Sequence, residues 1–203
     1  LRQLVQKENN RYALSKEQIR MITTASALHD IGKISIPDEI LNKPGRLTAE
    51  EFAVIKGHSM AGANMLSELP LDQKEEPLVK TAYEICRWHH ERYDGGGYPD
   101  GLKGEEIPVS AQVVALADVY DALTSERCYK DAYSHEKAIE MILAGQCGAF
   151  NPLMLECLLD ISSSLKKKMG YKSKERYEQT DLSDIASRFH DFEMDSSEKI
   201  VQQ

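Results

Sequence analysis

The chain has 203 residues, 41% hydrophobic and 29% charged, which is enough to bury a core as one domain or as one domain with an extension. Acids outnumber bases by 33 to 25, and the net charge of −8 argues against a nucleic acid polymer as a partner. No apolar run is long enough to span a bilayer and no secretory signal opens the chain, so we expect no membrane contact from this segment. The four cysteines form no C-x-x-C pair and lie among apolar neighbours, which indicates reduced, buried thiols in a cytoplasmic protein: Cys86, Cys128, Cys147 and Cys157.

Helical signals dominate the first half of the chain. Capping-box sequences at 15–18 and 48–51 predict two helix starts. Apolar residues at helical spacing carry the first helix to about residue 31, whereas the second is either one helix or two with a break near Gly57. Pro77 opens a third helix, which ends near His89-His90 before a loop rich in Gly and Pro over 91–108.

Three further helices are predicted in the second half, over about 113–124, after Ser134 and after Asn151-Pro152. The composition becomes polar after about residue 164, where the tail is either a loosely attached helix or partly disordered. We therefore predict an all-α fold, a bundle of about six to eight helices over residues 1–163, followed by a polar extension over 164–203.

Histidines and acids occur together at the predicted helix ends. His29-Asp30 and His89-His90 are neighbouring pairs, and adjacent residues on a helix point about 100° apart, so the two members of a pair reach different positions. Imidazole and carboxylate are ligands for divalent metals, and two such pairs favour a site for several ions over a single zinc. His58 also has a simpler interpretation, as a hydrogen-bonded structural residue.

Acidic and basic residues extend this pattern. Asp118 interrupts a helix face that should be apolar, and a buried acid needs a cation or another partner. Asp118 and Asp121 could equally face solvent, and Asp30 could merely shape a helix end. Lys33 lies one helical turn after His29-Asp30, where its charge could contact a phosphate. His135 and His190 lack neighbours of comparable quality, so we place both on the surface.

The strings ALHDIGK, HHERYDGGGYP and ALADVYDALTSERCYK, with His58 between the first two, resemble the HD-GYP subgroup of the HD phosphohydrolase superfamily over roughly residues 15–160. The resemblance implies an all-helical domain that holds two or three divalent metal ions, most often iron or manganese. It also implies hydrolysis of cyclic di-GMP to linear pGpG, and in some members to GMP, by water activated between metal ions.

The resemblance also assigns roles to residues. The implied metal ligands are His29, Asp30, His58, His89, His90 and Asp118. Asp30 would bridge two metals, and Lys33 would contact the scissile phosphate. Arg127 and Lys130 match basic positions that hold substrate phosphates, and Asp121 would help to recognise a guanine edge. Glu91 would either orient a ligand histidine or lie on the surface.

One feature departs from the family pattern. The family usually takes a further histidine ligand from a helix upstream of the H-D pair, and no histidine occurs among residues 1–28. That position would fall at or before Leu1, so we expect a fragment whose first helix is incomplete; the alternative is a protein that lacks this histidine, holds one metal weakly and has reduced activity. The alternatives are a phosphohydrolase of another nucleotide and a degenerate nucleotide-binding signalling module. By analogy we also expect a preceding sensory or receiver domain and leave a homodimer open.

Overall fold

The regular structure is entirely helical in the residues that the computed structural model describes, which are 1–7, 12–126 and 131–168. The helices are α1 (Arg2–Gln6), α2 (Lys16–Ala25), α3 (Asp38–Leu41), α4 (Ala49–Ser67), α5 (Leu71–Lys74), α6 (Pro77–Trp88), α7 (Val109–Thr124), α8 (His135–Leu143) and α9 (Pro152–Lys168). Three 3₁₀ turns lie between them: η1 (Ser26–Leu28), η2 (Ile31–Ser35) and η3 (Gly104–Glu106). The predicted all-α fold is confirmed.

The predicted helix starts are confirmed by their caps. The side chains of Ser15 and Thr48 each accept a hydrogen bond from the backbone N–H three residues on. In return, the backbone N–H of each cap residue donates to the side chain of that same later residue, which completes a capping box. Pro77 is the first residue of α6, and Ser134 caps α8. The helix that follows Thr48 is continuous through Gly57, so the alternative of a break there is wrong.

The first predicted helix is shorter than its apolar spacing suggests. The α-helix ends at Ala25, and the chain continues through the tighter turns η1 and η2. The Ser26 carbonyl accepts hydrogen bonds from both the backbone N–H and the ring Nδ1 of His29. This local pairing replaces the i to i+4 pattern, so His29 and Asp30 lie in a turn instead of on a regular helix.

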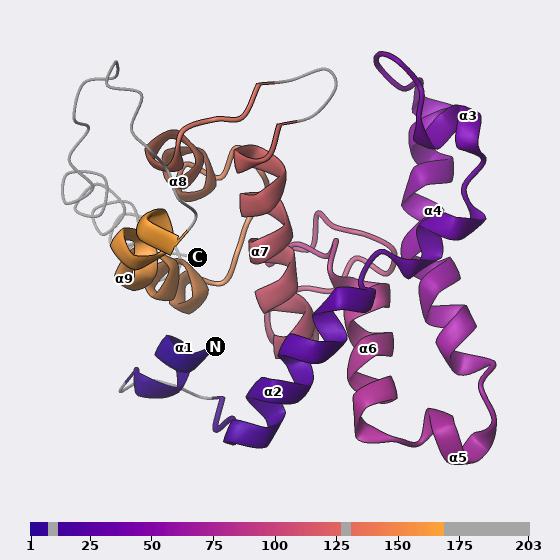
Figure 1. The fold of residues 1–203 in the computed structure, drawn as a ribbon, viewed down its shortest axis with the longest axis horizontal. Helices are drawn as coiled ribbons and strands as arrows, with labels where there is room; N and C mark the ends of the chain where they lie inside the picture. The colour runs from indigo at the N-terminus through magenta and orange to yellow at the C-terminus, as the bar shows by residue number, and fades with distance from the viewer. Residues whose placement is uncertain (8–11, 127–130, 169–203) are drawn as a thin grey trace, which may run out of the picture.

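Helix α7 separates two hydrophobic cores (Figure 1). On one side, α2, α4 and α6 pack around a buried cluster that includes Ile22, Ala63 and Ile85. On the other side, α1, α8 and α9 pack around a second cluster that includes Leu4 and Ile139. Because α7 contributes buried residues to both cores, its position is fixed on two sides. The predicted ligand Asp118 therefore projects from a well-anchored helix.

Helix α9 crosses the predicted domain boundary. It continues without interruption to Lys168, so residues 164–168 belong to the helical bundle. The rest of the predicted extension, with His190, lies outside the described residues. None of the described helices combines the length and apolar character that a bilayer crossing needs.

The prediction that His135 lies on the surface is wrong. His135 is fully buried at the start of α8. Its Nδ1 is 2.7 Å from the Tyr120 hydroxyl of α7, and its Nε2 is 2.7 Å from the Ser162 hydroxyl of α9. Both partners are distant in the sequence, so the residues next to His135 gave no signal of its burial.

Candidate metal centre

Direct packing of the backbone of η2 against α4 brings His29 and Asp30 close to His58. A Cβ atom on Gly32 would stand 1.9 Å from the His58 carbonyl oxygen and 2.5 Å from the Gly62 amide nitrogen. Only glycine permits η2 to approach α4 this closely. As a result, Asp30 Oδ1 lies 3.3 Å from His58 Nε2 and Asp30 Oδ2 lies 3.3 Å from His29 Nε2.

The end of α6 and the middle of α7 complete the cluster. His58 Nε2 is 3.3 Å from His89 Nε2, and one ligand atom from each of His58, His89 and His90 lies within 4.8 Å of the others. From α7, Asp118 Oδ1 is 3.8 Å from His29 Nε2. We call the six side chains the histidine–aspartate cluster: His29, Asp30, His58, His89, His90 and Asp118.

Hydrogen bonds fix the tautomers of three of these histidines. In each, the ring Nδ1 faces a backbone carbonyl, which can only accept, so Nδ1 carries the hydrogen. The pairs and their Nδ1-to-oxygen distances are His29 with Ser26 (2.8 Å), His58 with Ile55 (2.7 Å) and His89 with Ile85 (2.8 Å). In His58 and His89, whose rings are neutral, Nε2 then offers its lone pair to the interior of the cluster, as metal-ligating histidines do.

Burial keeps the deepest histidines neutral. It lowers the pKa of His89 to about 4 and also lowers the pKa values of His58 and His90. At neutral pH the Nε2 atoms of His58 and His89 therefore present lone pairs to each other across 3.3 Å. A cation between them would turn this repulsion into ligation. His58 and His89 would then both hold the ion through Nε2.

His29 differs because it faces two carboxylates. Asp118 and Asp30 raise the pKa of His29 to about 10. Burial alone would raise the pKa of Asp30, but His29 and Lys33 lower it well below its usual value. Burial alone would also raise the pKa of Asp118, but His29, His90 and His89 together lower it. A divalent ion that binds here competes with the proton on His29.

The loop after His90 is built around a buried carboxylate. Glu91 is only 2% exposed and accepts hydrogen bonds from the backbone N–H groups of residues 100, 101 and 102, at 2.7, 3.0 and 3.1 Å. The predicted surface role of Glu91 is therefore wrong, and the hydrogen bonds found for its carboxylate in the described residues go to the loop backbone. Gly97 passes over the Glu91 backbone so closely that a Cβ there would stand 2.4 Å from Glu91 Cα. Together these contacts hold the loop that contains residues 97–99, here called the GYP loop, against the end of α6.

Of the residues predicted to bind substrate, one borders the cluster, one is exposed and two lie outside the described residues. Lys33 Nζ is 2.6 Å from Asp30 Oδ2, and its side chain is 40% exposed, so it borders the cluster. Asp121 is exposed one turn beyond Asp118, and among the described residues its side chain hydrogen-bonds only to Ser125. Arg127 and Lys130 lie outside the described residues.

The family can now be assigned. The HD domain family matches residues 1–150, which contain the whole histidine–aspartate cluster. The chain belongs to the HD domain family. The family predicted from the sequence motifs is confirmed.

Curated relatives of this HD domain carry phosphodiesterase names. A probable cyclic di-GMP phosphodiesterase of Vibrio cholerae is 45% identical over 73% of the chain and 34% of its own length. The cyclic di-GMP phosphodiesterase response regulator RpfG of Xanthomonas campestris is 43% identical over 77% of the chain and 40% of its own length. A 3'3'-cGAMP-specific phosphodiesterase 2 of Vibrio cholerae is 42% identical over 73% of the chain and 28% of its own length. The chain thus spans about a third of these relatives.

Two residues of the HD domain that border the cluster were not singled out in the sequence. The Tyr98 ring stacks on His90, with 4.8 Å between centroids, and the Lys56 ammonium lies over the Tyr98 ring.

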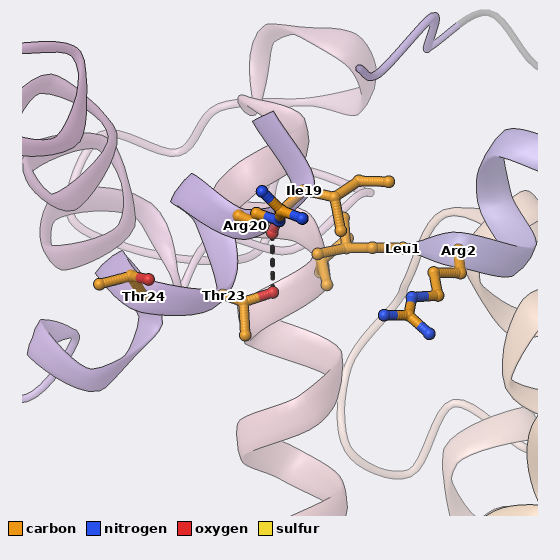
Figure 2. Close-up of a pocket in the computed structure, with 7 residues that line it drawn as sticks. Leu1, Arg2, Ile19, Arg20, Thr23 and Thr24 are labelled. Carbon is orange, nitrogen blue, oxygen red and sulfur yellow. Dashed lines mark hydrogen bonds between the residues drawn. The ribbon is translucent and has the colours of Figure 1, made fainter. Parts of the chain in front are cut away.

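A hollow of about 570 Å³ lies elsewhere, between α1, α2 and α7 (Figure 2). Its lining residues are Leu1, Arg2, Ile19, Arg20, Thr23, Thr24 and Val113. None of them belongs to the histidine–aspartate cluster.

Proposed function

We propose that this chain is the catalytic domain of a metal-dependent phosphodiesterase that hydrolyses cyclic di-GMP to linear pGpG, with GMP as a further product to test. The observation that carries the proposal is the convergence of six ligand-type side chains from four segments, with at least two Nε2 lone pairs directed at one another. The names of the relatives support a cyclic dinucleotide as the substrate.

The histidine–aspartate cluster would hold two or three divalent ions, with iron or manganese as the expected metals. Ions in such a site acidify water and offset the negative charge of a phosphodiester. Asp30 directs one carboxylate oxygen toward His58 and the other toward His29, the arrangement that a ligand bridging two ions requires. A degenerate module would be expected to lose such ligands, and all six are retained.

The surrounding side chains would bind and orient the substrate. Lys33 is held at the edge of the cluster by Asp30, so its ammonium can stabilise charge that develops on the scissile phosphate. Arg127 and Lys130 remain proposed contacts to substrate phosphates, and Asp121 a proposed contact to a guanine edge. A cytoplasmic location, a preceding sensory or receiver domain and a homodimer also remain predictions.

A second substrate has specific support. One relative is named for 3'3'-cGAMP, and its 42% identity is close to the 45% of the relative named for cyclic di-GMP. These identities do not separate the two substrates. Cyclic GMP–AMP is therefore the alternative, with the same metal chemistry and a different base at one position.

Metal analysis combined with a substrate panel tests the proposal. The chain, loaded anaerobically with Fe(II) or with Mn(II), is assayed for hydrolysis of cyclic di-GMP, cyclic GMP–AMP and cyclic di-AMP. We expect stoichiometric metal and turnover of cyclic di-GMP, and we expect His89→Ala to lose both. Faster turnover of cyclic GMP–AMP would favour the alternative. Tight binding of a cyclic dinucleotide by metal-loaded protein, without hydrolysis of any of the three, would overturn the enzymatic proposal.

A further inference from the structure

Lys56 is a cation at the edge of the cluster that has aromatic partners but no acidic one. It lies on α4, two residues before the proposed ligand His58. Its Nζ is 4.9 Å from the centroid of the Phe52 ring and 5.2 Å from that of Tyr98. Among the described residues, no carboxylate pairs with this ammonium, and no hydrogen-bond acceptor for it is found.

Several other lysines of the described chain pair with carboxylates. Lys43 pairs with Glu51 at 2.6 Å, and Lys80 pairs with Glu75 at 2.5 Å. Lys33, inside the site, pairs with Asp30. The three N–H donors of the Lys56 ammonium have no such acceptor, whereas two ring faces hold its position.

The Lys56 ammonium is held in a defined position relative to the cluster. The Tyr98 ring, which it covers, stacks on His90 at an interplanar angle of 27°, and the Tyr98 N–H donates to the His90 carbonyl. Helix α4 itself is held against η2 by the close approach at Gly32. Only the Tyr98 ring therefore lies between the Lys56 ammonium and the proposed ligand His90 in this stack.

We propose that Lys56 binds the phosphodiester of a cyclic dinucleotide that is not being cleaved. The inference rests on the proposed function. A cyclic dinucleotide carries two phosphodiesters in one ring, so when one lies at the cluster beside Lys33, the second must lie nearby and outside the ligands. The ammonium on Phe52 and Tyr98 is a cation in that outer region whose donors are uncommitted. Lys56 is thus a substrate-positioning residue, and Phe52 positions Lys56.

The test compares a substrate with two phosphodiesters and a substrate with one. Lys56→Met keeps the apolar stem and removes the charge, so KM for cyclic di-GMP should rise roughly tenfold or more, as expected for loss of one charge-assisted hydrogen bond. Because Lys56 contacts neither the ligands nor the scissile bond, kcat should change less than about threefold. Hydrolysis of bis(p-nitrophenyl) phosphate, which has one phosphodiester, should stay within about twofold of wild type.

Matched variants separate this role from a structural one. Lys56→Arg keeps a positive charge and should recover most of the KM. Phe52→Ala removes one of the two rings and should raise KM in the same direction by a smaller factor. Val54→Ala is the control, because Val54 is comparably exposed on α4, at 41% against 46% for Phe52, and has no ring to lie against the Lys56 ammonium. It should leave KM unchanged.

The outcomes distinguish the two proposals. An unchanged KM for cyclic di-GMP in Lys56→Met overturns the role of Lys56 while leaving the proposed function intact. Equal losses on both substrates, or loss of bound metal, also overturn it, because the defect would then lie in the cluster or the fold. If the metal-loaded wild type hydrolyses bis(p-nitrophenyl) phosphate but no cyclic dinucleotide, the proposed function fails, and the role of Lys56 fails with it.

Discussion

Substitution of Gly32 by alanine tests the packing that assembles the cluster. The added methyl group meets backbone atoms, at 1.9 Å from the His58 carbonyl oxygen and 2.5 Å from the Gly62 amide nitrogen. Ordinary contact begins at 3.4 Å, so η2 and α4 must move apart by about 1.5 Å. That displacement also carries Asp30 away from His58, which it now approaches to 3.3 Å.

The expected cost follows from the kind of atom that must move. Overpacking a core usually costs about 1–3 kcal/mol, and here neither backbone neighbour can change rotamer. We therefore expect Gly32→Ala to lower the free energy of unfolding by about 3 kcal/mol, measured by urea denaturation of chelator-treated protein. The chelator removes bound metal, so the measured free energy of unfolding reports the packing of the protein without the stabilising effect of the metal. Metal content of the reloaded variant, measured by mass spectrometry, should fall as well.

Gly57 provides a matched control on α4. A Cβ atom there meets nothing within 4 Å, and the position is an exposed helix interior. Gly57→Ala should therefore stabilise the protein by about 0.5–1 kcal/mol, because alanine has the better helix propensity. The reasoning is refuted if Gly32→Ala unfolds at the wild-type urea midpoint and binds metal normally, or if both variants are destabilised equally.

Three further predictions concern the GYP loop and the core. Glu91→Gln places an amide among three backbone N–H donors and should lower the free energy of unfolding by about 1–3 kcal/mol in urea; an unchanged midpoint would contradict this. Hydrogen bonds from Arg87 and Trp88 lower the pKa of Asp100 in the folded protein. The ionised Asp100 carboxylate therefore stabilises the fold above its unfolded-state pKa of about 4, and this stabilisation is lost as pH falls through the lower pKa of the folded state. Asp100→Asn should thus be less stable than wild type at pH 7, and the gap should close below about pH 4; a gap that persists in acid would count against the pairing. Burial raises the pKa of Cys86 to about 11, so iodoacetamide at pH 8 should label it only as fast as the protein unfolds, and labelling at the rate of the denatured chain would disprove this.

The sequence by itself predicted the features that depend on neighbouring residues. The capping boxes at Ser15 and Thr48 and the first turn at Pro77 use backbone groups within three positions, so composition and spacing were sufficient. The helix end at His89 was predicted for the same reason. The six candidate ligands were named from motifs, because the types of side chain needed to hold divalent ions are few.

Tertiary structure decided how these side chains meet and which other groups surround them. The contact of Gly32 with α4, which sets the distance between Asp30 and His58, joins residues from separate elements and leaves no periodic pattern. The burial of Glu91 beneath residues 100–102 and of His135 between α7 and α9 likewise depends on hydrogen-bond partners distant in sequence. Local chemistry acts over a few residues, whereas approach between elements is set by packing of the whole bundle. For that reason the candidate ligands could be named from the sequence, and the geometry that brings them together could not.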